Sequence, residues 1–420
     1  MESVGIVVVA GVVLAFGLVS RRLQRSILTP PMIFVALGVT IGPLGFGIVE
    51  FDTEHGWFHT LAELTLVLVL FTDASRINLR LLWEQHGLPM RMLLIGMPLT
   101  IAAGAGVAAG VFSVWSVWEA CALAAILAPT DAALGQAVVS SPDVPVRIRQ
   151  TLNAESGLND GIALPVVLFF ITCAGAMGDS QESTEWIGFT AKQLIYGPLV
   201  GFLVGRFGGG LVIWCRDRGL MNEVFTSLSA ISLALMSYAI AYLVGGNGFI
   251  AAFVAGMTLG NLCEKTCMSL VEFAEVEGQL MTLLVFLVFG ASMVPLVVHD
   301  FQWAYVAYGL LSLTVLRMLP VALSLLGSGV RGPTYAFLGW FGPRGIASIL
   351  FALLVVEPML PHSEEILAVV TVTVFLSVFL HGMTAAPVSR AYGARVRAAG
   401  DDACEMQHVD EHPLRIRHTH

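Results

Sequence analysis

The sequence predicts an all-α polytopic membrane protein with about thirteen transmembrane helices. Of its 420 residues, 56% are hydrophobic and 12% are charged, whereas about 25% of residues are charged in a soluble domain. The mean hydropathy is +0.82. The apolar residues fall in blocks that approach the ~20 residues a helix needs to cross a bilayer. Two blocks carry proline beside charged residues, which predicts an inverted repeat with two discontinuous crossing helices.

The predicted spans follow the apolar blocks in chain order. They are Val4–Ser20, Pro31–Val49, Leu61–Ser75, Leu88–Gly110, Glu119–Val139, Thr151–Gly175, Gly188–Trp214, Val224–Val244, Gly248–Cys263, Gly278–Val298, Trp303–Gly327, Thr334–Val356 and Ile366–Pro387. The first span precedes its basic cluster, whereas a signal peptide has its positive region first. We therefore expect the first span to be retained.

Basic residues are unevenly divided between the two sides of the predicted bundle. One side holds Arg21, Arg22, Arg25, Arg76, Arg80, Arg147, Arg149, Arg216, Arg218, Lys265, Arg331, Arg390, Arg395, Arg397, Arg415 and Arg417. On the opposite side only Lys192 is found. Cytoplasmic loops are rich in Lys and Arg. We therefore expect a multi-pass protein of the cell (inner) membrane, with its N-terminus outside and its C-terminus in the cytoplasm.

Neither the cysteines nor the tail predicts a cofactor. Only Cys263 and Cys267 lie close together, and the second pair or the histidines that a zinc site needs are not nearby. The tail after Pro387 is short and polar, and its histidines at 408, 412, 418 and 420 form no dense cluster. We expect plain thiols, a solvated cytoplasmic tail, no cofactor and no nucleic-acid partner.

Two spans are predicted to be interrupted at membrane depth. The fifth reads CALAAILAPTDAALGQAVV and contains Pro129 and Asp131, and the twelfth reads AFLGWFGPRGIASILFALLV and contains Pro343 and Arg344. Proline removes a backbone donor and clashes with the preceding turn. The two spans are an odd number of crossings apart, so they run in opposite directions, as in an inverted repeat. Ordinary proline kinks would explain neither charged residue.

The two charged residues suit such a crossing. In an antiparallel pair of interrupted helices, ends of like partial charge face each other. Asp131 is predicted to neutralise the two N-terminal ends, and Arg344 the two C-terminal ends.

The sixth span carries two acids within the stretch NAESGLNDG. Its polar members are Glu155, Ser156, Asn159 and Asp160. At about 100° per residue they share an arc of about 140°, while Gly157 and Gly161 lie on the other side and allow close packing. Asp160 is about 13 Å into the membrane. The arc is predicted to face the fifth span, near Thr130 and Asp131.

One arginine lies inside a neighbouring apolar span, in LTVLRMLPVALSLL. It is Arg317, and a buried carboxylate and guanidinium neutralise each other. We predict that Glu155 pairs with Arg317, with Arg344 as the second choice. Asp160 then remains to take a proton or a metal cation. The alternative is that both acids are paired and inert, with Arg344 on Asp160.

Oxygen ligands suit a hard monovalent cation such as Na⁺. The predicted ligands are Asp160, Glu155, the Ser156 hydroxyl and the hydroxyl or carbonyl of Thr130, with Asn159 and Asp131 beside them.

Together, the stretches APTDAALG, NAESGLNDG and GPRGIAS, with Arg317 in an apolar span, resemble the NhaP-type sodium/proton antiporters, which are prokaryotic relatives of the eukaryotic sodium/proton exchangers. The resemblance runs from the second span to the last and implies an NhaA/NhaP-like antiporter fold. It also implies a homodimer. We expect the cation and the proton to compete at Asp160, because either can neutralise a carboxylate at the membrane midplane. The pair Asn159 and Asp160 goes with electroneutral one-for-one exchange in this family.

The same resemblance implies two structural domains in the lipid bilayer. Residues 1–87 and 176–302 would form the dimerisation domain together with the linking seventh span. Residues 88–175 and 303–388 would form a core that carries the ion in an elevator-like movement, and residues 389–420 a short cytoplasmic tail.

Two other functions are weighed against antiport. A cation channel would need a polar stripe along a whole pore, whereas the polar groups here cluster at one depth. An intramembrane aspartyl hydrolase would use Asp131 and Asp160 as a proton-sharing pair, but the sequence contexts of those enzymes are absent. We therefore expect a transporter and not an enzyme.

Overall fold

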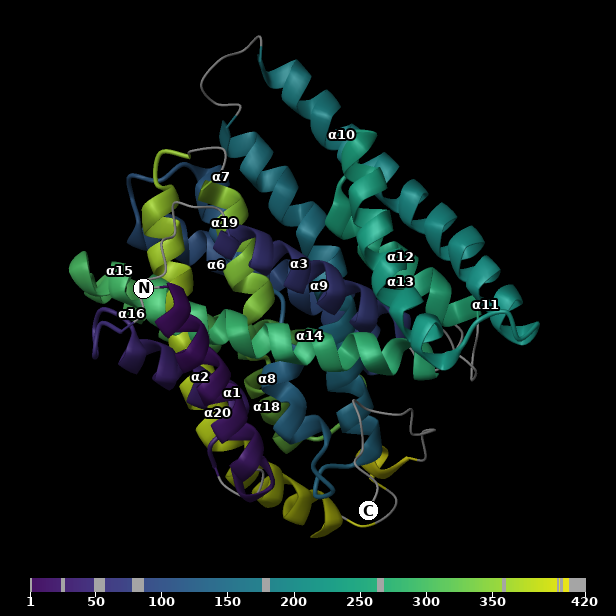
Figure 1. Cartoon of the computed structure of the whole chain (residues 1–420). Helices are drawn as coiled ribbons and strands as arrows, with labels where there is room; N and C mark the ends of the chain where they lie inside the picture. The colour runs from purple at the N-terminus through teal and green to yellow at the C-terminus, as the bar shows by residue number, and fades with distance from the viewer. Residues whose placement is uncertain are drawn as a thin grey trace.

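The computed structural model describes residues 2–23, 27–48, 57–77, 87–175, 182–262, 268–356, 360–398, 400 and 403–407. Within them all regular secondary structure is helical, and each predicted span contains helix (Figure 1). The all-α fold class is therefore confirmed. Seven of these helices are long and apolar enough to cross a membrane by length and composition, and four shorter apolar helices accompany them. The number of crossings stays a prediction.

One group of packed helices comes from two separate stretches of chain. It contains α1 (Glu2–Leu23), α2 (Pro30–Ile41), α3 (Trp57–Ser75), α10 (Glu182–Leu203), α11 (Gly209–Asp217), α12 (Glu223–Leu243), α13 (Gly248–Leu262), α14 (Met268–Val288) and α15 (Val294–His299). Glycine allows its backbones to meet: a Cβ on Gly256 of α13 would overlap the carbonyl oxygen of Phe71 of α3. α10 meets α13 in the same way at Gly201.

The second group holds the interrupted helices. It contains α5 (Gly87–Arg91), α6 (Met97–Val111), α7 (Val117–Ile126), α8 (Ala132–Val139), α9 (Val146–Gly175), α16 (Trp303–Leu313), α17 (Val315–Ser324), α18 (Gly332–Trp340), α19 (Ile346–Val356) and α20 (Ser363–Ala398). α7 packs on α9, and α20 packs on α16 and α19. The two groups follow the residue ranges expected for the dimerisation and core domains. Their roles stay predictions.

Short π-helical turns continue three of the longer spans. They are Met92–Gly96 between α5 and α6, Val204–Gly208 between α10 and α11, and Phe289–Met293 between α14 and α15. These turns were not expected from the sequence.

Both predicted interruptions are present. α7 ends at Ile126, before Pro129, and α18 ends at Trp340, before Pro343. In Figure 1, α7 and α19 lie in the upper half of the molecule and α8 and α18 in the lower half. The two interrupted helices therefore run in opposite directions, as an inverted repeat requires.

A third interruption was not expected. The span predicted as continuous from Trp303 bends at Thr314, where φ is −112° and ψ is −97°. The Thr314 hydroxyl donates to the Leu310 carbonyl at 2.6 Å, a contact that bends helices. Pro320, two turns further on, has no N–H for the Leu316 carbonyl. The bend lies one turn before Arg317, so it sets the direction of that side chain.

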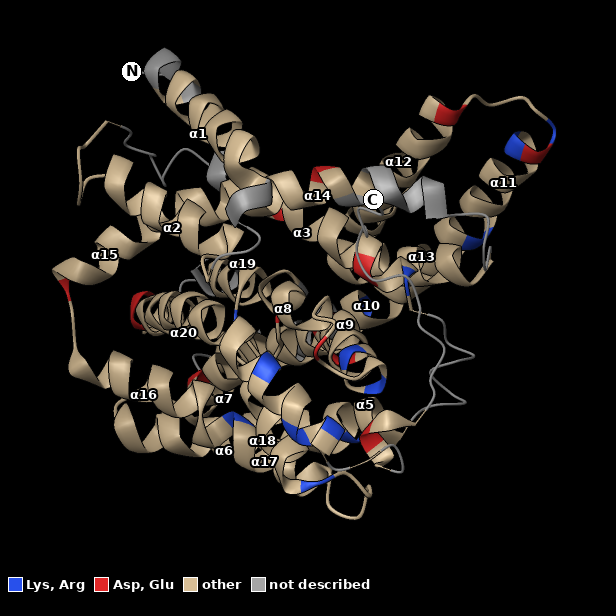
Figure 2. Cartoon of the chain, turned by 90° about the horizontal axis from the view of Figure 1, so that it is seen from below, with Lys and Arg blue, Asp and Glu red and all other residues tan. Residues whose placement is uncertain are grey.

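Basic positions lie in several parts of the described chain. Figure 2, seen from below, shows Lys and Arg positions around α5, α9 and α18, and others at the end of α11. The charge asymmetry between two faces, and the assignment of one face to the cytoplasm, stay predictions. Outside the described residues lie Arg25, Arg80, Lys265, Arg415, Arg417, Cys263, Cys267 and the histidines at 408, 412, 418 and 420.

α9 touches the other group of helices beside the polar arc. A Cβ on Gly161 would overlap the ring of Phe253 on α13, whereas a Cβ on Gly157 would lie 3.8 Å from the Asp73 carbonyl oxygen, an ordinary contact. The predicted close packing is therefore present at Gly161 and absent at Gly157.

The tail departs from the solvated end that was expected. α20 continues past Pro387 to Ala398, and residues 403–407 pack against the second helix group. Glu405 is 1% exposed, and its Oε1 accepts hydrogen bonds from the Arg331 amide and the Thr334 hydroxyl, both at 2.8 Å. Arg147, at the start of α9, donates to the Gln407 side chain at 2.6 Å. The tail thus joins the ends of α9 and α18.

We predict that Glu405→Gln lowers the melting temperature at pH 7 but not at low pH. Burial raises the pKa of Glu405, but the hydrogen bonds from Arg331 and Thr334 outweigh it, so the pKa lies below its ordinary 4.5. Such a carboxylate stabilises the docked tail above its ordinary pKa, and the stabilisation is lost as the pH falls through the docked pKa. Melting curves of parent and variant, measured from pH 7 to well below the ordinary pKa of 4.5, follow this difference.

Asp143→Asn is the control for that comparison. Asp143 forms an exposed pair with Arg397 at 3.4 Å, and exposed pairs contribute little. Equal melting temperatures of parent and Glu405→Gln at pH 7 would contradict the docking.

We also predict that Gly161→Ala destabilises the protein and that Gly157→Ala does not. The methyl group at 161 would enter the Phe253 ring, and overpacking of a core costs about 1–3 kcal/mol. The two substituted positions are one helical turn apart on α9. Thermal unfolding of both variants measures the difference in stability. Phe253→Leu in the Gly161→Ala background should restore part of the loss. Equal stability of the two glycine variants would show that the Phe253 contact does not constrain α9.

Candidate ion-binding site

Asp131 holds two helix N-termini at once. Its Oδ1 accepts hydrogen bonds from the amides of Ala133 and Leu134 in α8, at 2.6 and 3.2 Å. Its Oδ2 accepts one from the Ile346 amide in α19, at 2.8 Å. The Asp131 amide in turn donates to the Pro343 carbonyl at 2.8 Å. Both facing N-terminal ends therefore meet one carboxylate, as the sequence predicts.

Arg344 meets only one of the two C-terminal ends. Its Nη1 donates to the carbonyls of Ala128 and Pro129, at 2.5 and 3.0 Å, where α7 unwinds. Ser348 adds a hydrogen bond to the Ile126 carbonyl at 2.8 Å. The C-terminal end of α18 is held instead by His381 of α20, whose Nε2 lies 2.8 Å from the Trp340 carbonyl oxygen. The expectation that Arg344 serves both C-terminal ends was therefore wrong.

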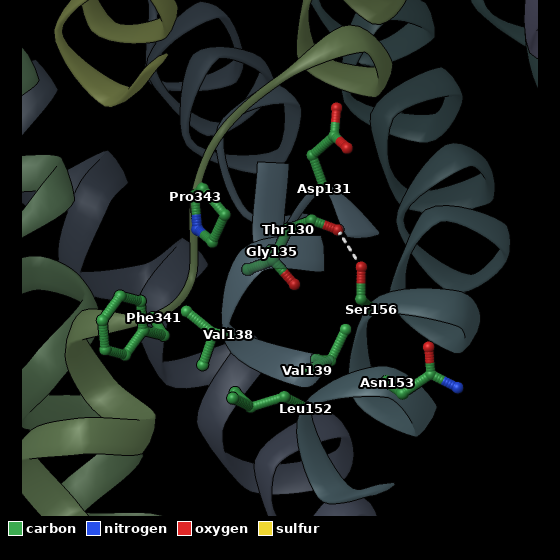
Figure 3. Close-up of a pocket in the computed structure, with 10 residues that line it drawn as sticks. All are labelled: Thr130, Asp131, Gly135, Val138, Val139, Leu152, Asn153, Ser156, Phe341 and Pro343. Carbon is green, nitrogen blue, oxygen red and sulfur yellow. Dashed lines mark hydrogen bonds between the residues drawn. The ribbon is translucent and has the colours of Figure 1, made fainter. Parts of the chain in front are cut away.

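The unwound stretch after α7 faces the polar arc of α9. The Ser156 hydroxyl donates to the Thr130 carbonyl at 2.7 Å, and the Asn159 side-chain amide donates to the Thr130 hydroxyl at 2.6 Å. Figure 3 draws the first of these bonds as a dashed line. Because α7 has ended, the Thr130 carbonyl is not used within a helix. This residue is therefore brought to the α9 arc through both its backbone and its side chain.

Glu155 and Arg317 form a buried ion pair. Arg317 Nη2 lies 2.6 Å from Glu155 Oε1, and the side chains are 1% and 3% exposed. Gly342 of the second unwound segment makes room for it, because a Cβ there would lie 2.6 Å from Arg317 Nε. Of the two partners weighed for Glu155, the structure pairs it with Arg317.

Asp160 follows Asn159 on the same arc and is 7% exposed. Glu155 and Asp160 are five residues apart on α9. Glu155 faces the Arg317 guanidinium, and Asp160 directly follows Asn159, whose amide is fixed on Thr130. A site of oxygen atoms is thus assembled from α9 and the unwound segment, the chemistry that a hard cation prefers.

A pocket leads to the unwound segment. It is lined by Thr130, Asp131, Gly135, Val138, Val139, Leu152, Asn153, Ser156, Phe341 and Pro343 (Figure 3). α8 and the first turns of α9 form its walls, and these lie on the side of Arg147 and Arg149. Thr130 and Ser156 thus line a pocket near the end of α9 that carries Arg147 and Arg149.

Three polar residues around the crossing were missed by reasoning from the sequence. They are Ser348, Ser377 and His381. Ser348 lies in GPRGIAS, one turn beyond Arg344, so its helical spacing was a usable signal. Ser377 and His381 are one turn apart on α20, and nothing local in that span indicates which element they face.

We predict that Arg317→Ala strongly destabilises the protein. The change leaves Glu155 buried without its ion-pair partner, and breaking one side of a buried pair costs about 3–5 kcal/mol. The double variant Glu155→Gln with Arg317→Gln removes both charges and should recover much of the stability, but less of the transport. Melting temperature and yield of the two variants test the pair. An Arg317→Ala protein that melts like the parent would contradict it.

Comparison with known proteins places these features in a family. The family described as "Sodium/hydrogen exchanger, transmembrane" matches residues 7–391. The K⁺/H⁺ antiporter NhaP of Alkalimonas amylolytica is 26% identical over 405 residues, which are 93% of this chain and 67% of that protein. The K⁺/H⁺ antiporter NhaP2 of Shewanella sp. strain MR-4 is 24% identical over 89% of this chain and 63% of its own length. The chain thus spans about two thirds of these bacterial relatives.

A eukaryotic relative and a solved structure agree with this. The Na⁺/H⁺ antiporter of Schizosaccharomyces pombe is 24% identical over 88% of this chain and 83% of that protein. The sodium proton antiporter MjNhaP1 of Methanocaldococcus jannaschii shares the fold, with a TM-score of 0.75, 19% identity and coverage of 91% of this chain and 100% of that one.

These relatives are named as antiporters and not as enzymes, so the expectation of a non-enzyme is confirmed and the hydrolase alternative falls. The predicted NhaP-like fold and the resemblance to NhaP-type antiporters are likewise confirmed. With a match that runs from residue 7 to residue 391, the chain belongs to the transmembrane sodium/hydrogen exchanger family.

Proposed function

We propose that this protein exchanges a monovalent cation for a proton across the membrane, and that both compete for Asp160. One observation carries the proposal: α9 buries Asp160 directly after Asn159, whose amide is fixed on Thr130, while the second buried acid of the same arc, Glu155, is paired with Arg317. A buried carboxylate is costly in hydrocarbon unless a cation or a proton neutralises it. Competition at Asp160 supplies that neutralisation in both halves of the cycle.

Thr130, Ser156 and Asn159 complete the proposed site. The hydrogen bonds from Ser156 and Asn159 fix the oxygens of Thr130 beside the arc, so these groups are preorganised for a hard cation. Asp131 is engaged by three backbone amides. We therefore assign it to the helix ends rather than to the transported ion.

One-for-one exchange follows from the same assignment. Because Arg317 already neutralises Glu155, the charge that changes partner is that of Asp160 alone. One cation then leaves for each proton that enters, and the cycle moves no net charge. We propose Na⁺ as the cation. The relatives named above include K⁺/H⁺ and Na⁺/H⁺ antiporters, so K⁺ and Li⁺ belong in the same test.

An elevator-like movement of the second helix group against the first suits this site. The two groups meet at Gly161 and Phe253, one residue from Asp160, and Thr130 lines a pocket together with residues of α8, α9 and the second unwound segment. We propose that the first group, with residues 1–87 and 176–302, forms a homodimer in the bilayer and stays fixed, while the second group carries the ion past it.

The test is proton flux in proteoliposomes of the purified parent chain. Na⁺, Li⁺ and K⁺ are added in turn, with the membrane potential clamped at zero or imposed. Proton efflux driven by a cation, at a rate independent of the imposed potential, supports electroneutral exchange. A rate that follows the potential refutes the one-for-one ratio, and cation flux without any proton flux points to a channel.

We predict that Asp160→Asn abolishes antiport and leaves the fold intact. An amide neither takes up a proton nor carries the charge that attracts a cation, so both half-cycles stop. In the parent, lowering the pH should raise the cation concentration for half-maximal exchange while the maximal rate changes much less. Asp160→Glu keeps the carboxylate and should retain some activity with altered selectivity. Antiport by well-folded Asp160→Asn in the same vesicles would overturn the mechanism.

A further inference from the structure

α20 contacts the second interrupted helix at its break. His381 is 2% exposed, and its Nε2 lies 2.8 Å from the carbonyl oxygen of Trp340, the last residue of α18. The imidazole also stacks on the Trp340 indole, with ring centroids 5.0 Å apart and planes at 29°. The Trp340 carbonyl also accepts from the Gly342 amide at 2.8 Å, so the ring is a second polar contact of a carbonyl at the end of α18.

Ser377, one turn earlier on α20, holds the other side of the same break. Its hydroxyl oxygen accepts a hydrogen bond from the Arg344 amide at 2.7 Å and lies 3.2 Å from His381 Nδ1. His381 Nδ1 also lies 3.0 Å from the Ser377 carbonyl oxygen, so both ring nitrogens contact oxygen atoms of the two residues they join. Polar contacts through Ser377 and His381 thus connect the Arg344 amide to the Trp340 carbonyl through α20.

Residues 341–345, which α20 holds in this way, contact the break of the first interrupted helix. The Pro343 carbonyl accepts from the Asp131 amide, the Arg344 side chain donates to the end of α7, and the Ile346 amide just beyond the segment donates to the Asp131 carboxylate. Thr130 precedes Asp131 directly. A shift of residues 341–345 is therefore passed to Thr130, whose two oxygens face α9.

We propose that Ser377 and His381 are positioning residues for cation binding: they fix residues 341–345 so that Thr130 is presented to the ion site on α9. They touch neither Asp160 nor Glu155 through any contact described above, and they act through the backbone of the second break. The transport part of this inference rests on the proposed antiport, whereas the fixation of the segment does not.

Other buried hydroxyls of α20 provide a matched control. Thr371 is 2% exposed and its hydroxyl donates to the Leu367 carbonyl of the same helix at 2.7 Å. Thr371→Val and Ser377→Ala therefore both remove one buried hydroxyl from α20. Only the second removes an acceptor from the unwound segment.

The experiment combines hydrogen–deuterium exchange with transport in the full-length chain. We expect Ser377→Ala and His381→Ala to speed amide exchange in peptides that cover residues 341–346. We also expect the cation concentration for half-maximal exchange to rise about tenfold, because the buried Arg344 amide loses its acceptor, with the maximal rate changed less. Ser377→Thr restores the hydroxyl and should restore both values. Thr371→Val should match the parent in both.

Each of the following results supports or overturns the proposal. A folded Ser377→Ala protein with the parent's amide exchange and the parent's half-maximal concentration overturns the proposal. An equal shift in Thr371→Val also overturns it, because any buried hydroxyl would then have the same effect. If His381→Ala does not fold, Ser377→Ala and its Ser377→Thr rescue decide alone. A parent that moves no proton against any cation refutes the proposed function, while amide exchange still reports on the segment.

Discussion

Helix ends of like partial charge face each other twice inside this molecule, and the core depends on neutralising both pairs. Asp131 takes the two N-terminal ends through three amide hydrogen bonds. Arg344 donates a hydrogen bond to a carbonyl at the C-terminal end of α7, and His381 contacts the last carbonyl of α18. Unsatisfied backbone groups cost several kcal/mol each in hydrocarbon, so irregular backbone is tolerated at this depth only with such partners.

Because of that constraint, the buried charged residues have different functions. Because Asp131 and Arg344 serve the backbone, the chemistry of the ion is left to α9. There the first acid is neutralised by Arg317 at 2.6 Å, and the second lies beside an amide fixed on Thr130. Burying charges is costly unless each has a partner. Because separate residues neutralise the helix ends and bind the ion, the helix ends stay fixed while a cation and a proton exchange at the ion site.

Most of this core could be predicted from the sequence because its signals are local. Proline beside a charge indicated both interruptions, helical spacing gathered the arc of α9, and a single arginine in an apolar span indicated the partner of Glu155. The bend at Thr314 is different, since threonine is common in helices that stay straight. The roles of His381 and Glu405 depend on which distant helix end each one meets. The same holds for Phe253 against Gly161, because a glycine in the sequence does not specify what approaches it.

The crossing also imposes an order of assembly. The groups that complete the first break lie far along the chain: Ile346 comes 215 residues after Asp131, and Arg344 comes 216 residues after Ala128. Helices are delivered to a membrane in the order of synthesis, so α7 and α8 arrive well before α18 and α19. An open break in lipid would leave bare carbonyls and amides there. The first interrupted helix must therefore be shielded or remain closed until the second arrives, and its unwound segment reaches its final conformation only after almost all the other helices are in place.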